Sequence, residues 1–196
     1  MQHAIAHLRA ADPVLADVID AVGPYDLTPS PQGFHALADA IVSQQISIKA
    51  AAAIMGRLEQ LLGEVAPARL LAVEPEELRA IGLSGQKARY LRDLAERTAV
   101  GGLDLAALPA LDDAAVIAQL TAVKGIGRWT AEIYLMFALG RPDVLPAEDL
   151  GLRYAVQQFY QLPAPPTPAE VRRIGEAWRP HRSVASWYLW RGRRAR

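Results

Sequence analysis

Apolar residues recur at steps of three and four along most of the chain, and the strict alternation of half-buried strands is scarce. The pattern is clearest in one stripe that ends at a glycine and consists of Ile48, Ala51, Met55, Leu58 and Leu62. Because this spacing places the apolar side chains on one face of a helix, it predicts an all-α chain.

Capping residues and helix breakers indicate where the helices begin and end. Asp12 followed by Pro13 predicts a helix start, as do Asp112 and the capping box that begins at Thr167. Glycines and prolines mark most of the ends. The predicted helices span about residues 3–10, 13–22, 33–42, 48–62, 75–81, 85–100, 113–121, 127–138 and 150–160, with another from residue 168.

Two of these helices are joined by so few residues that they form a hairpin, over about residues 113–138. Its bend contains Gly125 and Gly127, which allow backbone N–H groups to approach a ligand without a Cβ in the way. Amides at a helix start attract phosphate, and Lys124 and Arg128 add positive charge. The same glycines also fit an ordinary tight turn, but together with the flanking helices the bend favours phosphate binding.

Two adjacent carboxylates, Glu148 and Asp149, precede the helix predicted from Leu150. Asp149 fits a helix N-cap, with Glu148 in solvent. A fixed anion near a phosphate-binding hairpin also fits a reaction in which a sugar develops positive charge, such as glycosidic bond cleavage. The residues themselves leave both interpretations open.

Composition narrows the function classes. The 196 residues are 52% hydrophobic, enough for a core, and their 21 basic and 21 acidic side chains cancel. Residues 121–196 nevertheless carry 12 basic and 6 acidic side chains, so positive charge collects there. The absence of cysteine excludes disulfides, thiolate metal sites and cysteine nucleophiles. No apolar run is long enough for a membrane helix, and no signal peptide is evident, so we expect a cytoplasmic protein, associated with the nucleoid if bacterial.

Several ordered motifs resemble the helix-hairpin-helix DNA glycosylases of the DNA-3-methyladenine glycosylase II type. They are the hairpin VKGIG followed by RWTA, the later PAEDLGL, and the stretches AIVSQQIS, GLSGQKARYL and WRPHRSVA. The resemblance covers about residues 30–192. It implies a single all-α domain over residues 1–196, made of two helical lobes with a cleft between them. We expect the compact form, because an N-terminal β domain has no room before Gln44, and a frayed arginine-rich tail at residues 192–196.

The resemblance implies an enzyme of base excision repair that flips alkylated bases such as 3-methyladenine and 7-methylguanine out of duplex DNA and cleaves the N-glycosidic bond. Asp149 matches the catalytic aspartate of the family. Trp129 stands where glycosylases with lyase activity have a nucleophilic lysine, and tryptophan cannot form a Schiff base. We therefore expect a monofunctional enzyme that leaves an abasic site. The alternative is a non-catalytic helix-hairpin-helix DNA-binding module.

Further site residues follow from the same resemblance. Trp129, Ile133 and His181 match the lining of the base pocket, although relatives often have aromatic rings at the last two positions. Trp129 also fits a helix core. Gln45 matches the side chain inserted into the gap that the flipped base leaves, or it bonds within its turn.

The hairpin residues Lys124, Gly125, Ile126, Gly127 and Arg128 are expected to contact DNA. The backbone carbonyls of Thr121, Val123 and Ile126 match positions that hold a monovalent cation. No cofactor is expected to be required. The expected partner is double-stranded DNA with alkylated bases, no membrane contact is expected, and the chain is expected to be a monomer.

Overall fold

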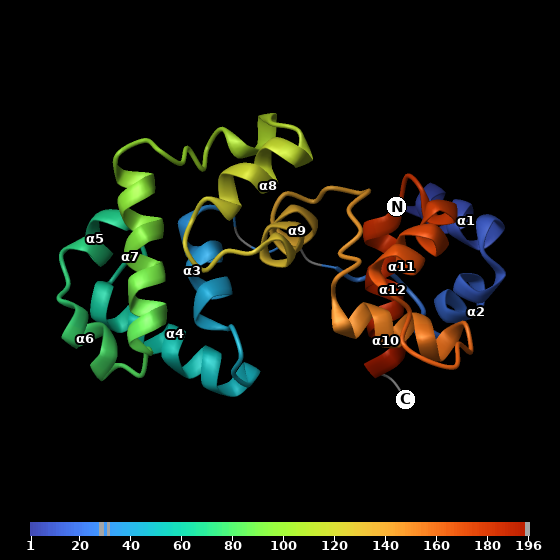
Figure 1. Ribbon diagram of the computed structural model, residues 1–196, viewed down its shortest axis with the longest axis horizontal. Coiled ribbons are helices and arrows are strands. Elements are labelled where there is room, and N and C mark those ends of the chain that lie inside the picture. The colour runs from blue at the N-terminus through green and yellow to red at the C-terminus, as the bar shows by residue number, and fades with distance from the viewer. Residues whose placement is uncertain (28–29, 31, 195–196) are drawn as a thin grey trace. The chain divides into compact units, whose positions relative to one another are not determined.

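A computed structural model describes residues 1–27, 30 and 32–194, and within them helices and turns account for the whole fold, with no strand (Figure 1). The prediction of an all-α chain is therefore confirmed. The helices are α1 (Gln2–Ala11), α2 (Pro13–Val22), α3 (Phe34–Val42), α4 (Ile48–Leu62), α5 (Pro67–Leu71), α6 (Pro75–Ala80), α7 (Gly85–Ala99), η1 (Leu108–Ala110), α8 (Asp113–Thr121), α9 (Arg128–Phe137), α10 (Leu150–Phe159), α11 (Pro168–Ile174), η2 (Gly175–Trp178) and α12 (Arg182–Arg194).

Local capping bonds set the starts of the predicted helices. The Asp12 carboxylate accepts the Leu15 amide at 3.1 Å and begins α2, and the Asp112 carboxylate accepts the Ala115 amide at 2.7 Å and begins α8. Thr167 forms the expected capping box. These side chains satisfy amide groups that the first turn of a helix leaves without partners, which is why the predicted boundaries hold.

The structure differs from the predictions in its shortest elements and at its C-terminal end. The five residues of α5 and the two 3-10 helices are too short for a periodic pattern to show them. The tail expected to be frayed from residue 192 is helical through Arg194, because α12 continues to that residue and Gly192 is buried against Phe159 and Val18. Residues 195 and 196 lie outside the described part of the chain.

The chain divides into two compact units, in agreement with the two helical lobes that were predicted. Unit 1 combines Met1–Pro29 with Leu135–Arg196, and unit 2 comprises Ser30–Tyr134, so that α9 contributes to both. The chain therefore leaves unit 1, builds unit 2 as one continuous segment and then returns. Each unit is described below by itself.

The core of unit 1 surrounds α12, which packs against α1, α2 and α10. Trp178 and Tyr188 are fully buried in this core. One buried polar group joins the unit's first helices to its last: the Asp12 carboxylate accepts the Trp178 indole N–H at 2.8 Å and also the Tyr160 hydroxyl. A buried carboxylate needs such donors, because its desolvation would otherwise be costly.

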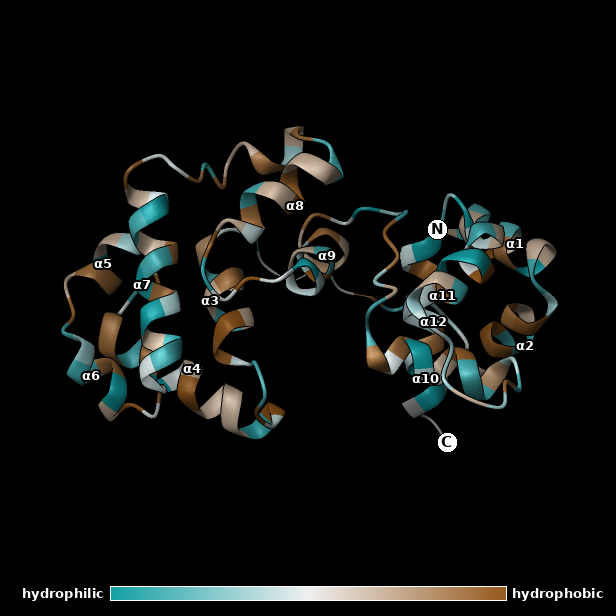
Figure 2. Cartoon of the chain, in the orientation of Figure 1, coloured by the Kyte–Doolittle hydropathy of each residue, from teal (hydrophilic) through white to brown (hydrophobic). Residues whose placement is uncertain are grey.

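The core of unit 2 surrounds α7, which packs against α3, α5 and α6, while α3 also packs against α4. Figure 2 shows α3 as largely hydrophobic and α7 as largely hydrophilic. The difference fits their burial: α3 buries five of its nine residues, whereas α7 buries only a stripe of four among its fifteen. Over the described residues, no helix combines the length and apolar character that a membrane crossing requires.

Candidate active site and nucleic-acid interface

The bend between α8 and α9 depends on Gly125 for a reason that the sequence does not reveal. Gly125 has φ 85°, and a Cβ at this position would lie 2.1 Å from Cδ2 of Tyr90. The glycine thus allows a left-handed turn to pack directly on an aromatic ring. The role predicted for Gly125, close approach of a phosphate, is corrected to close approach of Tyr90. Gly127 fits the prediction, because no described atom lies within 4 Å of the position of its Cβ.

The amides of the bend are only partly available to a ligand. The Lys124 amide donates to Asp93 Oδ2 at 2.9 Å, and the Ile126 amide donates within the turn at 3.1 Å. Among the described residues, no acceptor is paired with the amides of Gly125 and Gly127. The predicted phosphate site is therefore narrowed to these two amides beside the start of α9, where the helix dipole favours an anion.

The positive charges predicted beside the bend have acidic neighbours. Lys124 Nζ lies 3.4 Å from Asp93 Oδ1, and Arg128 Nε donates to Glu132 Oε1 at 2.9 Å. Burial by itself raises the pKa of Asp93, but hydrogen bonds from the Lys124 amide and the Arg97 guanidinium outweigh it and hold that pKa below its usual range. The carboxylate of Asp93 thus fixes the bend to α7 and offsets part of its positive charge.

The turn between α3 and α4 presents Gln45, which is exposed and has φ 57°. Lys87 holds this turn from α7: its ammonium donates to the carbonyls of Val42 at 2.6 Å and of Gln44 at 2.7 Å. Burial lowers the pKa of Lys87. The Gln44 side chain in turn donates to the Gly125 carbonyl at 2.8 Å. The Gln45 turn and the hairpin bend are thereby joined within unit 2.

Trp129 and Ile133 lie four residues apart on α9, so they share one face of this helix. The Trp129 residue is 44% exposed, and Ile133 is half-buried. The alternative of a buried core tryptophan is therefore wrong. An exposed indole beside a half-buried isoleucine forms an apolar surface that a planar ring can stack on.

Asp149 belongs to unit 1, where it caps α10. Its Oδ1 accepts the Leu152 amide at 2.6 Å and the Trp190 indole N–H at 2.8 Å. Glu148 is exposed and pairs with Arg172 at 2.8 Å. The N-cap interpretation of Asp149 is confirmed, and the two adjacent carboxylates have different surroundings: one is held by the backbone and an indole, the other by a surface arginine.

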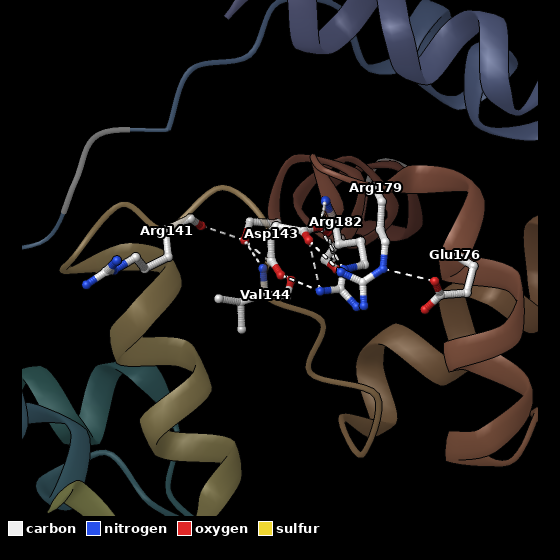
Figure 3. Close-up of polar contacts among 8 residues, drawn as sticks. Arg141, Asp143, Val144, Glu176, Arg179 and Arg182 are labelled. Atoms are coloured by element: carbon white, nitrogen blue, oxygen red, sulfur yellow. Dashed lines mark hydrogen bonds and ion pairs between the residues drawn. The ribbon is translucent and has the colours of Figure 1, made fainter. Parts of the chain in front are cut away.

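The loop that leads to Asp149 is fixed at its start by a polar cluster (Figure 3). Asp143 accepts Arg182 Nε at 2.7 Å and Nη2 at 3.0 Å, and it accepts Arg179 Nη1 at 2.9 Å. The Ser183 hydroxyl donates to the Arg141 carbonyl at 2.7 Å. Because these arginines and Ser183 lie at the start of α12 and just before it, the cluster attaches the loop to the central helix of unit 1.

His181 is half-buried at the start of α12, where its ring meets the edge of His7 with 5.4 Å between the ring centroids. Burial lowers the pKa of His181, and the nearby His7 lowers it further, although Asp143 opposes the shift. The imidazole is therefore neutral at pH 7. Across the described residues, no group of three or more acidic or histidine side chains is arranged to hold a metal ion.

Comparison with known proteins identifies the family. The family model for HhH-GPD superfamily base excision DNA repair proteins matches residues 38–180. The chain belongs to the HhH-GPD superfamily. DNA-3-methyladenine glycosylase 1 of Schizosaccharomyces pombe is 34% identical over 94% of this chain and 84% of its own length.

Two solved HhH-GPD structures agree with the fold. The S. pombe 3-methyladenine DNA glycosylase in complex with abasic DNA has a TM-score of 0.88 and 35% identity, covering 96% of this chain and 95% of its own. The DNA-3-methyladenine glycosidase of Bacillus halodurans has a TM-score of 0.86 and 40% identity, covering 95% of this chain and 87% of its own. The predicted helix-hairpin-helix glycosylase fold is confirmed.

Sequence reasoning identified the HhH-GPD hairpin and the Asp149 loop but missed three residues that hold them. Tyr90 and Lys87 lie within a motif that the sequence singled out, yet nothing in their spacing shows what they contact. Trp190 was grouped with aromatic residues that build the core, and Trp178, Trp187 and Tyr188 of that group are indeed buried. Trp190 differs because its indole donates to Asp149 from 41 residues away.

The Asp143 cluster predicts a measurable loss of stability. Asp143→Asn keeps the side-chain shape but removes the charge that two arginines share, so the free energy of unfolding should fall by about 1–2 kcal/mol. Chemical denaturation checks this value. Asp26→Asn serves as the control, because Asp26 pairs with Arg191 in an exposed salt bridge and should have almost no effect. Equal losses in the two variants would contradict the assignment.

The two hairpin glycines predict opposite results. Gly125→Ala should destabilise the fold, by at least about 1–2 kcal/mol from the left-handed backbone alone, with the Tyr90 clash in addition. Gly127→Ala should keep wild-type stability and weaken DNA binding about tenfold, because a methyl group then obstructs the phosphate. Thermal unfolding and fluorescence anisotropy at one fixed salt concentration measure both effects. A Gly127→Ala protein that binds DNA normally would exclude the narrowed phosphate site.

Proposed function

We propose that this protein is a monofunctional DNA glycosylase that releases alkylated bases, such as 3-methyladenine and 7-methylguanine, from duplex DNA and leaves an abasic site. The observation that carries the proposal is the Asp149 carboxylate, fixed at the start of α10 in a member of a base excision repair family. The S. pombe and B. halodurans relatives named above as 3-methyladenine enzymes support this substrate class.

The reaction needs one carboxylate and little acid catalysis. An alkylated purine already carries positive charge, so it can leave with the electron pair of the C1′–N bond without being protonated first. The sugar then develops positive charge, which Asp149 stabilises. Water adds its oxygen to C1′ and loses one proton, and the products are the free base and an abasic sugar. The neutral imidazole of His181 adds no repulsion toward a cationic base.

The position of Trp129 supports hydrolysis without strand cleavage. Strand cleavage by a glycosylase of this kind starts from a Schiff base between an amine and the sugar, and an indole provides no such amine. The exposed indole instead offers an aromatic face to an electron-poor base. We assign Trp129, Ile133 and His181 to the base pocket on this ground.

DNA contact is proposed for the bend of unit 2 and for the Gln45 turn. The amides of Gly125 and Gly127 would receive a phosphate, with Lys124 and Arg128 alongside. A cation fits the carbonyls of Thr121, Val123 and Ile126, because the C-terminal end of α8 carries the negative end of the helix dipole. Such an ion would connect the hairpin carbonyls to a DNA phosphate.

Asp149→Asn tests the function directly. Asparagine caps a helix as well as aspartate, so the fold should survive, whereas loss of the charge should slow base release by at least about a hundredfold. Release of free base from methylated duplex DNA is measured, and strand nicking is assayed separately before alkaline treatment. Wild-type protein should release base without nicking the strand.

Asp112→Asn is the matched control for this test, because Asp112 caps α8 through the same kind of bond and should release base at the wild-type rate. If Asp149→Asn retained the full rate, Asp149 would be only a cap. If wild-type protein bound DNA but released no methylated base, the non-catalytic binding module would be the better description.

Gln45→Ala tests the inserted side chain. Without it, the space left by the flipped base has no substitute, so release from a paired lesion should fall about tenfold. Release from the same lesion opposite a mismatch should fall less, because that base is already easier to unstack. Single-turnover rates on both duplexes give the comparison. Gln60→Ala, an exposed glutamine on α4 of the same unit, should change neither rate. Equal losses on both duplexes would contradict the insertion role.

A further inference from the structure

We infer that Trp190 and Gly151 position the catalytic carboxylate, so that the orientation of Asp149 is set by an indole N–H and by the space that a glycine leaves. The inference rests on the proposed role of Asp149 and extends it to two residues that do not themselves touch the substrate. All three residues lie in unit 1, on α10, at its start and on α12.

The geometry of the bonds carries the first step. Oδ1 of Asp149 accepts two N–H groups, from the Leu152 backbone at 2.6 Å and from Trp190 Nε1 at 2.8 Å. A capping bond alone fixes one oxygen from one direction. A second donor on the same oxygen, delivered by a large planar side chain, restricts rotation of the carboxylate about its side-chain bonds. Both donors are uncharged, so neither cancels the negative charge that the reaction uses.

The surrounding residues hold the indole in its place. Trp190 is half-buried and stacks on Phe137, with 6.0 Å between the ring centroids and 27° between the planes. Arg153, which follows Asp149 by one helical turn and would be a natural ion-pair partner, donates instead to the Pro166 carbonyl at 2.7 Å. The nearby arginine is thus committed to a backbone carbonyl, while an uncharged indole donates to the carboxylate.

Gly151 explains how the indole and the carboxylate can meet. A Cβ at this position would lie 3.0 Å from Asp149 Oδ1 and 3.5 Å from Trp190 Nε1. Gly151 is helical, and its backbone gives no reason for a glycine, which lowers helix propensity relative to alanine. The absence of a side chain therefore serves the contact between Trp190 and Asp149.

The same unit contains a second aspartate–tryptophan pair that provides a control. Asp12 caps α2 through the Leu15 amide and accepts the Trp178 indole N–H, also at 2.8 Å. That pair is buried in the core, and its two donors bind different oxygens. It joins helices together, whereas the Asp149 pair holds a half-buried carboxylate.

Three variants test the inference. Trp190→Phe keeps an aromatic ring against Phe137 but removes the N–H, and it should lower the single-turnover rate of base release by about tenfold to a hundredfold with DNA affinity unchanged. Gly151→Ala should also lower this rate, severalfold, in a folded protein. Trp178→Phe should lower the melting temperature but leave the rate unchanged below that temperature.

The indole N–H resonance of Trp190, assigned by its loss in Trp190→Phe, gives a readout independent of activity. It should shift in Asp149→Asn, because the acceptor oxygen loses its charge. A wild-type rate in Trp190→Phe or Gly151→Ala, an unshifted resonance, or an equal loss of rate in Trp178→Phe would overturn the inference. Failure of the proposed function is distinguishable, because Asp149→Asn would then release base normally whatever the Trp190 variant does.

Discussion

The hydrogen bond from the Leu152 amide to Asp149 is the interaction on which the arrangement of the site depends. It begins α10 at one residue, because a helix start needs an acceptor for amides that have no partner within the helix. It also places a carboxylate at the positive end of the helix dipole. One local bond therefore defines a structural boundary and positions the charged group to which the chemistry is assigned. The Asp143 cluster and the Trp190 indole act on the same short loop from α12.

The sequence predicted those parts of the fold whose causes are local. The boundaries of α2, α4 and α8 follow from a capping side chain at one end and, for the first two, from a glycine at the other. The Asp149 loop and the hairpin were also identifiable, because their residue types follow one another along the chain. Short α5 was missed because five residues do not complete a period, and the continuation of α12 was missed because arginines resemble a solvated tail.

The rest of the site depends on pairs that are distant in sequence, which no spacing shows. Gly125 meets Tyr90 across 35 positions, and Lys87 reaches back more than 40 residues to Val42 and Gln44. The positive charge of the C-terminal residues was interpretable only in the structure. Arg182 is occupied by Asp143, and others among these arginines bind carboxylates or carbonyls within unit 1. The charge balance of a segment thus overstates the charge that it can offer to DNA.

The contact between Gly125 and Tyr90 constrains how this hairpin can change over time. Position 125 is subject to two independent requirements, a left-handed backbone and an aromatic ring where a methyl group would stand. Shortening the side chain at position 90 would relieve the second requirement but leave the first, so no single substitution opens position 125 to other residues. The two positions are therefore expected to vary as a pair, and a lineage that alters the bend must first accept a gap in the packing of α7.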